Sequence, residues 1–136
     1  DIASQWEVVL LHPDATKRPA ENVWSPSEYG CHVRDVFRLF DFRLELMLTQ
    51  DDPMFPNWDQ DETAIKDRYD LQDPLNVRRE IAIAGDLLAD RFDAITASEW
   101  NRTGLRSDGA RFTVESFGRY LLHDPIHHLW DVARTY

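Results

Sequence analysis

The stretch WSPSEYGCHVRD, residues 24–35, marks the start of a long amphipathic helix. Ser25 is a favourable N-cap residue, Pro26 suits the first helical position, and Glu28 stands where a capping box requires it. Apolar residues then recur at helical spacing, at Tyr29, Val33, Val36, Phe37, Phe40, Leu44 and Met47. His32 lies at the border of this apolar stripe, where its side chain could reach both a bundle interior and a solvent-filled cleft.

Three further helices are indicated. Residues 2–11 consist of good helix formers with an apolar set at Ile2, Trp6, Val9 and Leu10. Asp73-Pro74 repeats the combination of cap and proline, and Thr113 can cap a last helix. The predicted helices cover residues 2–11, 25–48, 73–95 and 113–133. The connection between the second and third is long and holds only a short helical segment, and no strand longer than a few residues is indicated. The sequence therefore predicts an all-α four-helix bundle with a long crossover between helices two and three, in a single domain of residues 1–136.

Composition and charge narrow the function classes. The chain has 15 Lys and Arg against 25 Asp and Glu, a net charge of −10, which disfavours nucleic-acid partners. No apolar run approaches the ~20 residues of a membrane span, and no signal-peptide pattern is present at the start. Cys31 is the one cysteine, which fits a reducing cytoplasm, and we expect it to be a buried structural thiol. Asp1 stands in place of a start methionine, consistent with residues missing before it.

A group of histidines lies near the C-terminus in the stretch LHDPIHH, residues 122–128. His123 and His127 are four residues apart, so on a helix both imidazoles project from one face and could reach a single ion. His32 could supply a third nitrogen from another helix. Three neutral imidazoles suit zinc, nickel or iron and leave coordination positions open for water or substrate. The alternative is that these histidines are core or surface residues without a ligand.

Two neighbours complicate this histidine pair. Pro125 removes a helical hydrogen bond at a cost of ~3 kcal/mol, so the helix either bends there or restarts with Asp124 as its cap. We favour the bend, because residues 113–122 already predict helix. His128 points about 100° away from His127, and we expect it to pack or to meet solvent rather than to join the site.

These motifs resemble the DinB-like superfamily of metalloenzymes, over most of the chain from Trp24 to Val132. The resemblance rests on residues 24–35, on EWNRTG at residues 99–104, and on the closing His-x-x-x-His pair. It implies a four-helix bundle in which one histidine of helix two and the closing pair bind a divalent metal, usually zinc or nickel. Carried over to this chain, these ligands are His32, His123 and His127. Pro125 departs from the usual helical residues of the closing motif, which bears on the geometry of the site.

The resemblance also implies an activity, because characterised members use the metal to activate a small thiol such as mycothiol, bacillithiol or glutathione. Our first hypothesis is therefore a metal-dependent thiol transferase or isomerase that acts on a small molecule. The predominance of Arg over Lys favours mycothiol. The second hypothesis is a metal-dependent hydrolase, with Asp35 or Asp124 as the general base. The third is a non-catalytic bundle that binds partners or forms a homodimer, with an interface or pocket lined by Trp58, Trp100 and Trp130.

Overall fold

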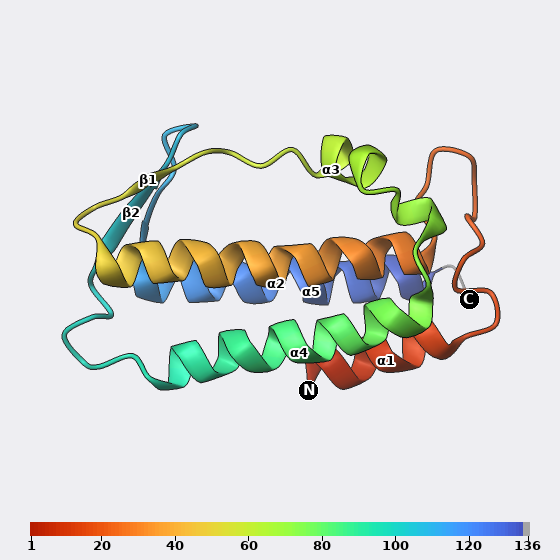
Figure 1. Ribbon diagram of the computed structural model, residues 1–136, viewed down its shortest axis with the longest axis horizontal. Coiled ribbons are helices and arrows are strands. Elements are labelled where there is room, and N and C mark those ends of the chain that lie inside the picture. Colours follow the sequence, from red (N-terminus) through yellow and green to blue (C-terminus); the bar gives the residue numbers. More distant parts are fainter. Residues whose placement is uncertain (135–136) are drawn as a thin grey trace.

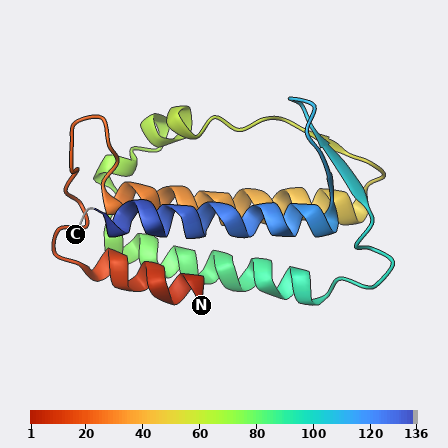
Figure 2. The ribbon, with the colours of Figure 1, turned by 180° about the vertical axis from the view of Figure 1, so that it is seen from behind.

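The computed structural model describes residues 1–134, so the last two residues of the predicted domain lie outside its described part. Four helices form a bundle, with long axes that run side by side (Figures 1 and 2). They are α1 (Ile2–Leu11), α2 (Pro26–Thr49), α4 (Pro74–Asp93) and α5 (Val114–Ala133). The crossover from α2 to α4 contains the short helix α3 (Gln60–Lys66) and the 3-10 turn η1 (Tyr69–Leu71). The predicted helical bundle with a long crossover is confirmed.

The helix starts follow the capping signals of the sequence. Ser25 Oγ accepts a hydrogen bond from Glu28 N at 3.2 Å, and Glu28 Oε2 accepts one from Ser25 N at 2.8 Å. This is a complete capping box, which satisfies amide groups that lack partners within the helix. Asp73 caps α4 through Leu75 N at 3.0 Å, and Thr113 caps α5 in a second reciprocal pair.

The crossover decides the direction of the helices. Because it returns the chain to the end of the bundle where α2 began, α2 and α4 run parallel, whereas α1 and α5 run antiparallel to them (Figure 1). Helix α2 contacts each of the other three helices. Residues on its buried face can therefore meet side chains from every neighbouring helix.

A small sheet lies where α2 ends and α5 begins (Figure 1). Strand β1 (Met54–Phe55) pairs in parallel with β2 (Thr103–Arg106), which pairs antiparallel with β3 (Arg111–Thr113). The sequence predicted only a loop between α4 and α5. These strands are too short to show an alternating pattern, and their pairing with the distant crossover segment is a tertiary contact that local sequence does not reveal.

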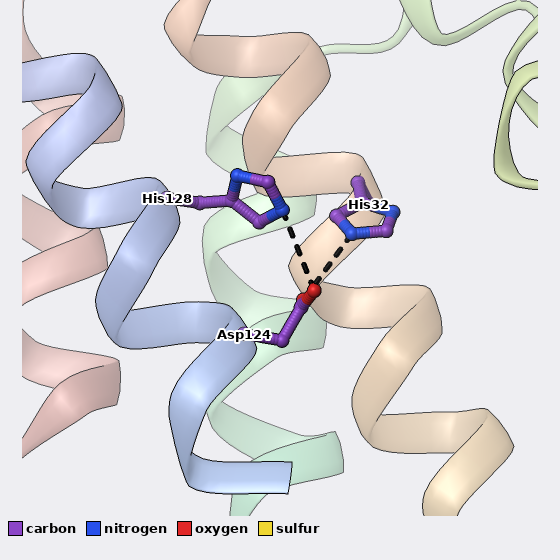
Figure 3. Close-up of side chains that lie close together, drawn as sticks. All are labelled: His32, Asp124 and His128. Atoms are coloured by element: carbon purple, nitrogen blue, oxygen red, sulfur yellow. Dashed lines mark ion pairs between the residues drawn. The ribbon is translucent and has the colours of Figure 1, made fainter. Parts of the chain in front are cut away.

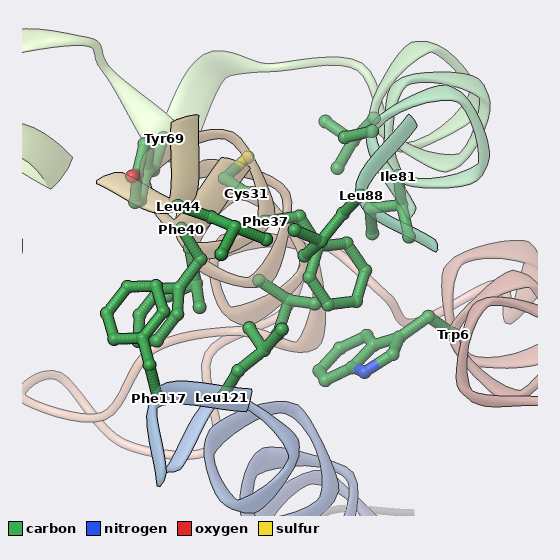
Figure 4. Close-up of a cluster of buried hydrophobic side chains, with 14 of the residues drawn as sticks. Trp6, Cys31, Phe37, Phe40, Leu44, Tyr69, Ile81, Leu88, Phe117 and Leu121 are labelled. Carbon is green, nitrogen blue, oxygen red and sulfur yellow. The ribbon is translucent and has the colours of Figure 1, made fainter. Parts of the chain in front are cut away.

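The core fills the space between the helices (Figure 4). Phe40 of α2 stacks on Phe117 of α5 with ring centroids 4.3 Å apart, and the Trp6 indole donates a hydrogen bond to the Pro125 carbonyl at 3.3 Å. Cys31 is fully buried, and burial raises the pKa of its thiol to about 12, as expected for a structural cysteine. None of the helices of residues 1–134 is long and apolar enough to cross a membrane.

Candidate metal centre

Three side chains from two helices converge near one end of the bundle (Figure 3). His32 projects from α2, and Asp124 and His128 project from α5, one helical turn apart. His32 Nε2 lies 3.2 Å from Asp124 Oδ2, and His128 Nε2 lies 3.5 Å from Asp124 Oδ1. One potential ligand atom from each residue falls within 4.8 Å of the other two. This separation is short enough for one cation to contact all three.

His32 and Asp124 form an ion pair but lack hydrogen bonds at several buried atoms. His32 is 1% exposed, and both of its ring nitrogens are buried without a hydrogen-bond partner among the described residues. Asp124 Oδ2 is in the same condition. A buried polar group without a partner costs about 1–3 kcal/mol. A divalent cation would satisfy these nitrogen and oxygen atoms, so the residues fit a metal ion.

The ionised state of Asp124 suits a cation. Burial alone would raise the pKa of the Asp124 carboxyl, but the adjacent imidazoles of His128 and His32 outweigh it and hold that pKa well below its usual range. Burial would lower the pKa of His128, yet hydrogen bonds to Asp124 and Asp131 raise it, which favours the protonated ring. A metal ion would have to displace that proton to bind Nε2 of His128.

Neighbouring side chains fix both rings. His128 Nδ1 lies 3.1 Å from Asp131 Oδ2, so a hydrogen bond donated through Nδ1 leaves Nε2 facing Asp124. The His32 ring stacks on Trp58 with centroids 5.5 Å apart and planes at 3°, while Trp24 packs against it at 5.6 Å. Such contacts restrict ring rotation and hold the nitrogens in a defined direction.

The structure does not bring His123 and His127 to His32. Both are exposed, and their rings stack on each other with centroids 5.8 Å apart. His127 Nε2 also lies 3.5 Å from Asp131 on the outer face of α5. The convergence expected of the three sequence-predicted ligands is therefore absent, and Asp124 and His128 take the positions beside His32 instead.

The burial pattern of α5 explains this difference. Phe117, Leu121, Pro125 and Val132 form the buried face, and Asp124 and His128 continue the Phe117–Leu121 row at helical spacing. This row places His128 on the side of α5 that meets α2, whereas His123 and His127 lie on an exposed face of the same helix. Helix α5 runs without interruption through Pro125, so the alternative of a restart at Asp124 is wrong.

The other residues expected at the site are distributed more widely. Asp35 is bound by Arg34 at 2.9 Å and by the Tyr69 hydroxyl, so it belongs to a separate polar network. The three tryptophans suggested for an interface or pocket lie apart. Trp58 stacks on His32, Trp100 packs against Phe92, and Trp130 is 55% exposed.

The protein is thus a helical bundle with a candidate metal centre, in which two histidines and one carboxylate lie between α2 and α5. The chain belongs to the DinB superfamily, whose sequence pattern matches residues 12–132. The predicted family is therefore confirmed. A comparison with curated proteins gave no match.

Two solved structures share the fold. YfiT from Bacillus subtilis, described as "a probable metal-dependent hydrolase with an unusual four-helix bundle topology", superposes with a TM-score of 0.80 at 17% identity, over 98% of this chain and 80% of YfiT. The mycothiol-dependent maleylpyruvate isomerase superposes with a TM-score of 0.75 at 14% identity, over 96% of this chain. This chain spans 56% of that isomerase. Likeness at such low identity concerns the fold alone.

Proposed function

We propose that this protein binds a divalent metal ion through His32, Asp124 and His128 and uses it in catalysis on a small molecule. The observation that carries the proposal is the approach of three ligand atoms to within 4.8 Å, with buried atoms on His32 and Asp124 that make no hydrogen bond. Two imidazoles and one carboxylate form a donor set that zinc, nickel and iron accept, and they leave positions open for a substrate.

We place thiol transfer or isomerisation first among the reactions. A divalent ion at this centre would lower the pKa of a thiol or a water molecule that joins it. Asp124 supplies negative charge to the centre, and Asp131 orients His128. Membership of the DinB superfamily and the likeness to a mycothiol-dependent isomerase support a low-molecular-weight thiol of the mycothiol type as co-substrate.

Hydrolysis is the second candidate, supported by the likeness to YfiT. A water nucleophile needs a general base, and the two acids suggested by the sequence are engaged elsewhere. Asp35 is held by Arg34 and Tyr69, and Asp124 lies between the imidazoles of His32 and His128. A thiol is far more acidic than water, so on joining a metal it gives up its proton to solvent more readily than water does. For this reason hydrolysis ranks below thiol chemistry.

Metal content tests the proposal directly. Protein purified without a histidine tag should contain a stoichiometric divalent metal, and His32→Ala, Asp124→Ala and His128→Ala should each lose it. His123→Ala and His127→Ala are matched controls, because they remove imidazoles from the same helix, and they should retain the metal. Loss of metal in these controls, with retention in His128→Ala, would contradict the ligand set. Absence of metal affinity in the wild type would leave the non-catalytic partner-binding or dimerising bundle.

A second measurement separates the two reactions. Titration of the metal-loaded protein with a small thiol should give saturable binding that is lost in His128→Ala if thiol activation is correct. Hydrolytic turnover without any thiol requirement would favour the alternative.

A further inference from the structure

A pocket of about 250 Å³ opens directly beside the proposed metal ligand His128. Its other lining residues include two aromatic residues, Trp24 and Tyr29, two amides, Asn22 and Gln60, and one acid, Asp61. Because His128 is part of both the pocket and the metal centre, a molecule bound in the pocket would lie next to the reacting position.

The two aromatic rings form a corner. The Trp24 and Tyr29 centroids are 5.4 Å apart and their planes meet at 71°, so the rings present differently oriented surfaces. Tyr29 also packs against the His128 ring at 5.1 Å, which ties the corner to the metal centre. An aromatic face that is open to a pocket attracts organic cations, because the ring quadrupole is negative over its face.

The pocket wall carries one carboxylate, that of Asp61, and no Lys or Arg. Asp61 makes no ion pair within residues 1–134, and it is the one acidic or basic side chain other than His128 in the pocket wall. A larger hollow of about 540 Å³ adjoins the pocket and shares Asn22, Trp24 and Asp61 with it.

The two arginines of the adjoining hollow do not offset this negative charge. Arg18 is held by Glu28 at 2.5 Å, and Arg68 is held by Asp70 at 3.0 Å. Each guanidinium is therefore already neutralised by a carboxylate, and an anionic ligand would find no free cation to pair with among the side chains that line either hollow.

We propose that the pocket beside His128 binds a substrate that carries a positively charged ammonium group, with the cation between Trp24, Tyr29 and Asp61. This inference rests on the proposed function, because it assigns the class of the substrate that the metal centre would act on. The amides of Asn22 and Gln60 can accept or donate hydrogen bonds to the polar groups of that molecule. A carboxylate between Trp24, Tyr29 and Asp61 would meet the negative charge of Asp61 and is disfavoured there.

The test uses two probes of nearly the same shape on the metal-loaded protein. Choline carries a quaternary ammonium group that cannot ligate a metal through nitrogen, and 3,3-dimethylbutanol is its uncharged analogue with the same hydroxyl group. Calorimetry should show choline binding about fivefold tighter than the alcohol, as expected for one cation–π contact and one exposed ion pair. Equal affinity for choline and the alcohol, or tighter binding of the alcohol, would overturn the proposal.

Variants locate the effect. Asp61→Asn should reduce the preference for choline and Asp61→Lys should reverse it. Glu62→Lys is the matched control, because Asp61 and Glu62 both stand in the first turn of α3 but only Asp61 lines the pocket. If Asp61→Lys still bound choline more tightly than the alcohol by the same factor, the ammonium site beside Asp61 would be refuted. Metal content is measured on the same samples. A protein that binds the metal but shows no preference for choline would contradict the ammonium site alone, whereas a protein that binds no metal would contradict the proposed function.

Discussion

His32 Nε2 and Asp124 Oδ2 face each other at 3.2 Å across the interface of α2 and α5, yet neither atom has a hydrogen-bond partner. A structural ion pair in a protein core normally has its remaining polar atoms satisfied. Here Nδ1 of His32 is also buried and unpartnered. The pair is therefore better explained as half of a metal site than as a device for stability, and the consequences can be measured.

Metal binding should stabilise the fold. At a free metal concentration of 100 times Kd, the free energy of unfolding should rise by about 2.7 kcal/mol, because the ion binds the folded chain and not the unfolded one. Chemical denaturation with and without the metal measures this gain. His128→Ala should abolish it and His127→Ala should preserve it. A gain that persists in His128→Ala would show that the ion binds elsewhere.

Asp131 should control metal affinity although it is not a ligand. Its carboxylate accepts the hydrogen bond that orients His128, and loss of such a partner typically lowers metal affinity about 10–100-fold. Competition with a chelator should show this decrease for Asp131→Ala. Glu115→Gln removes an exposed carboxylate from the same helix and should leave the affinity unchanged. Equal affinities for wild type and Asp131→Ala would refute the orienting role.

The capping box of α2 should make stability depend on pH. Burial would raise the pKa of Glu28, but hydrogen bonds from Arg18 and Ser25 outweigh it and hold that pKa below its ordinary value of 4.5. A lowered folded-state pKa means that the stabilisation is present above pH 4.5 and is lost as the pH falls through the folded value. Glu28→Gln should thus cost about 1.5–3 kcal/mol near neutral pH and less near pH 3. Urea denaturation at both pH values measures this, and a pH-independent cost would contradict it.

The contact of Phe40 with Phe117 should dominate the packing of α2 on α5. Phe117 is 1% exposed, so Phe117→Ala should lower the free energy of unfolding by about 3–5 kcal/mol through lost burial and a residual cavity. Phe42→Ala on the exposed side of α2 is the control, since Phe42 is 56% exposed, and should cost about 0.5 kcal/mol or less. Equal decreases in the free energy of unfolding for Phe117→Ala and Phe42→Ala would contradict a dominant role of the Phe40–Phe117 contact.

Local sequence determined the helices and their starts, because the capping signals act within a few residues of each other. Ser25 and Glu28, Asp73 with Pro74, and Thr113 each begin a helix where their side chains satisfy free amide groups. Such contacts are independent of the rest of the fold, and the long crossover followed from the absence of helical signals between them. The strands did not follow in this way, because β1 and β2 are about fifty residues apart and neither has a pattern of its own.

The face of α5 that meets His32 was decided only by the tertiary structure. Neighbouring residues on a helix point about 100° apart, so a shift by one position exchanges His123 and His127 for Asp124 and His128. The burial of Phe117, Leu121 and Val132 against the other helices fixes this rotation. The sequence alone therefore predicted a histidine-containing site between the second and the last helix, while packing of the core selected which side chains turn toward it.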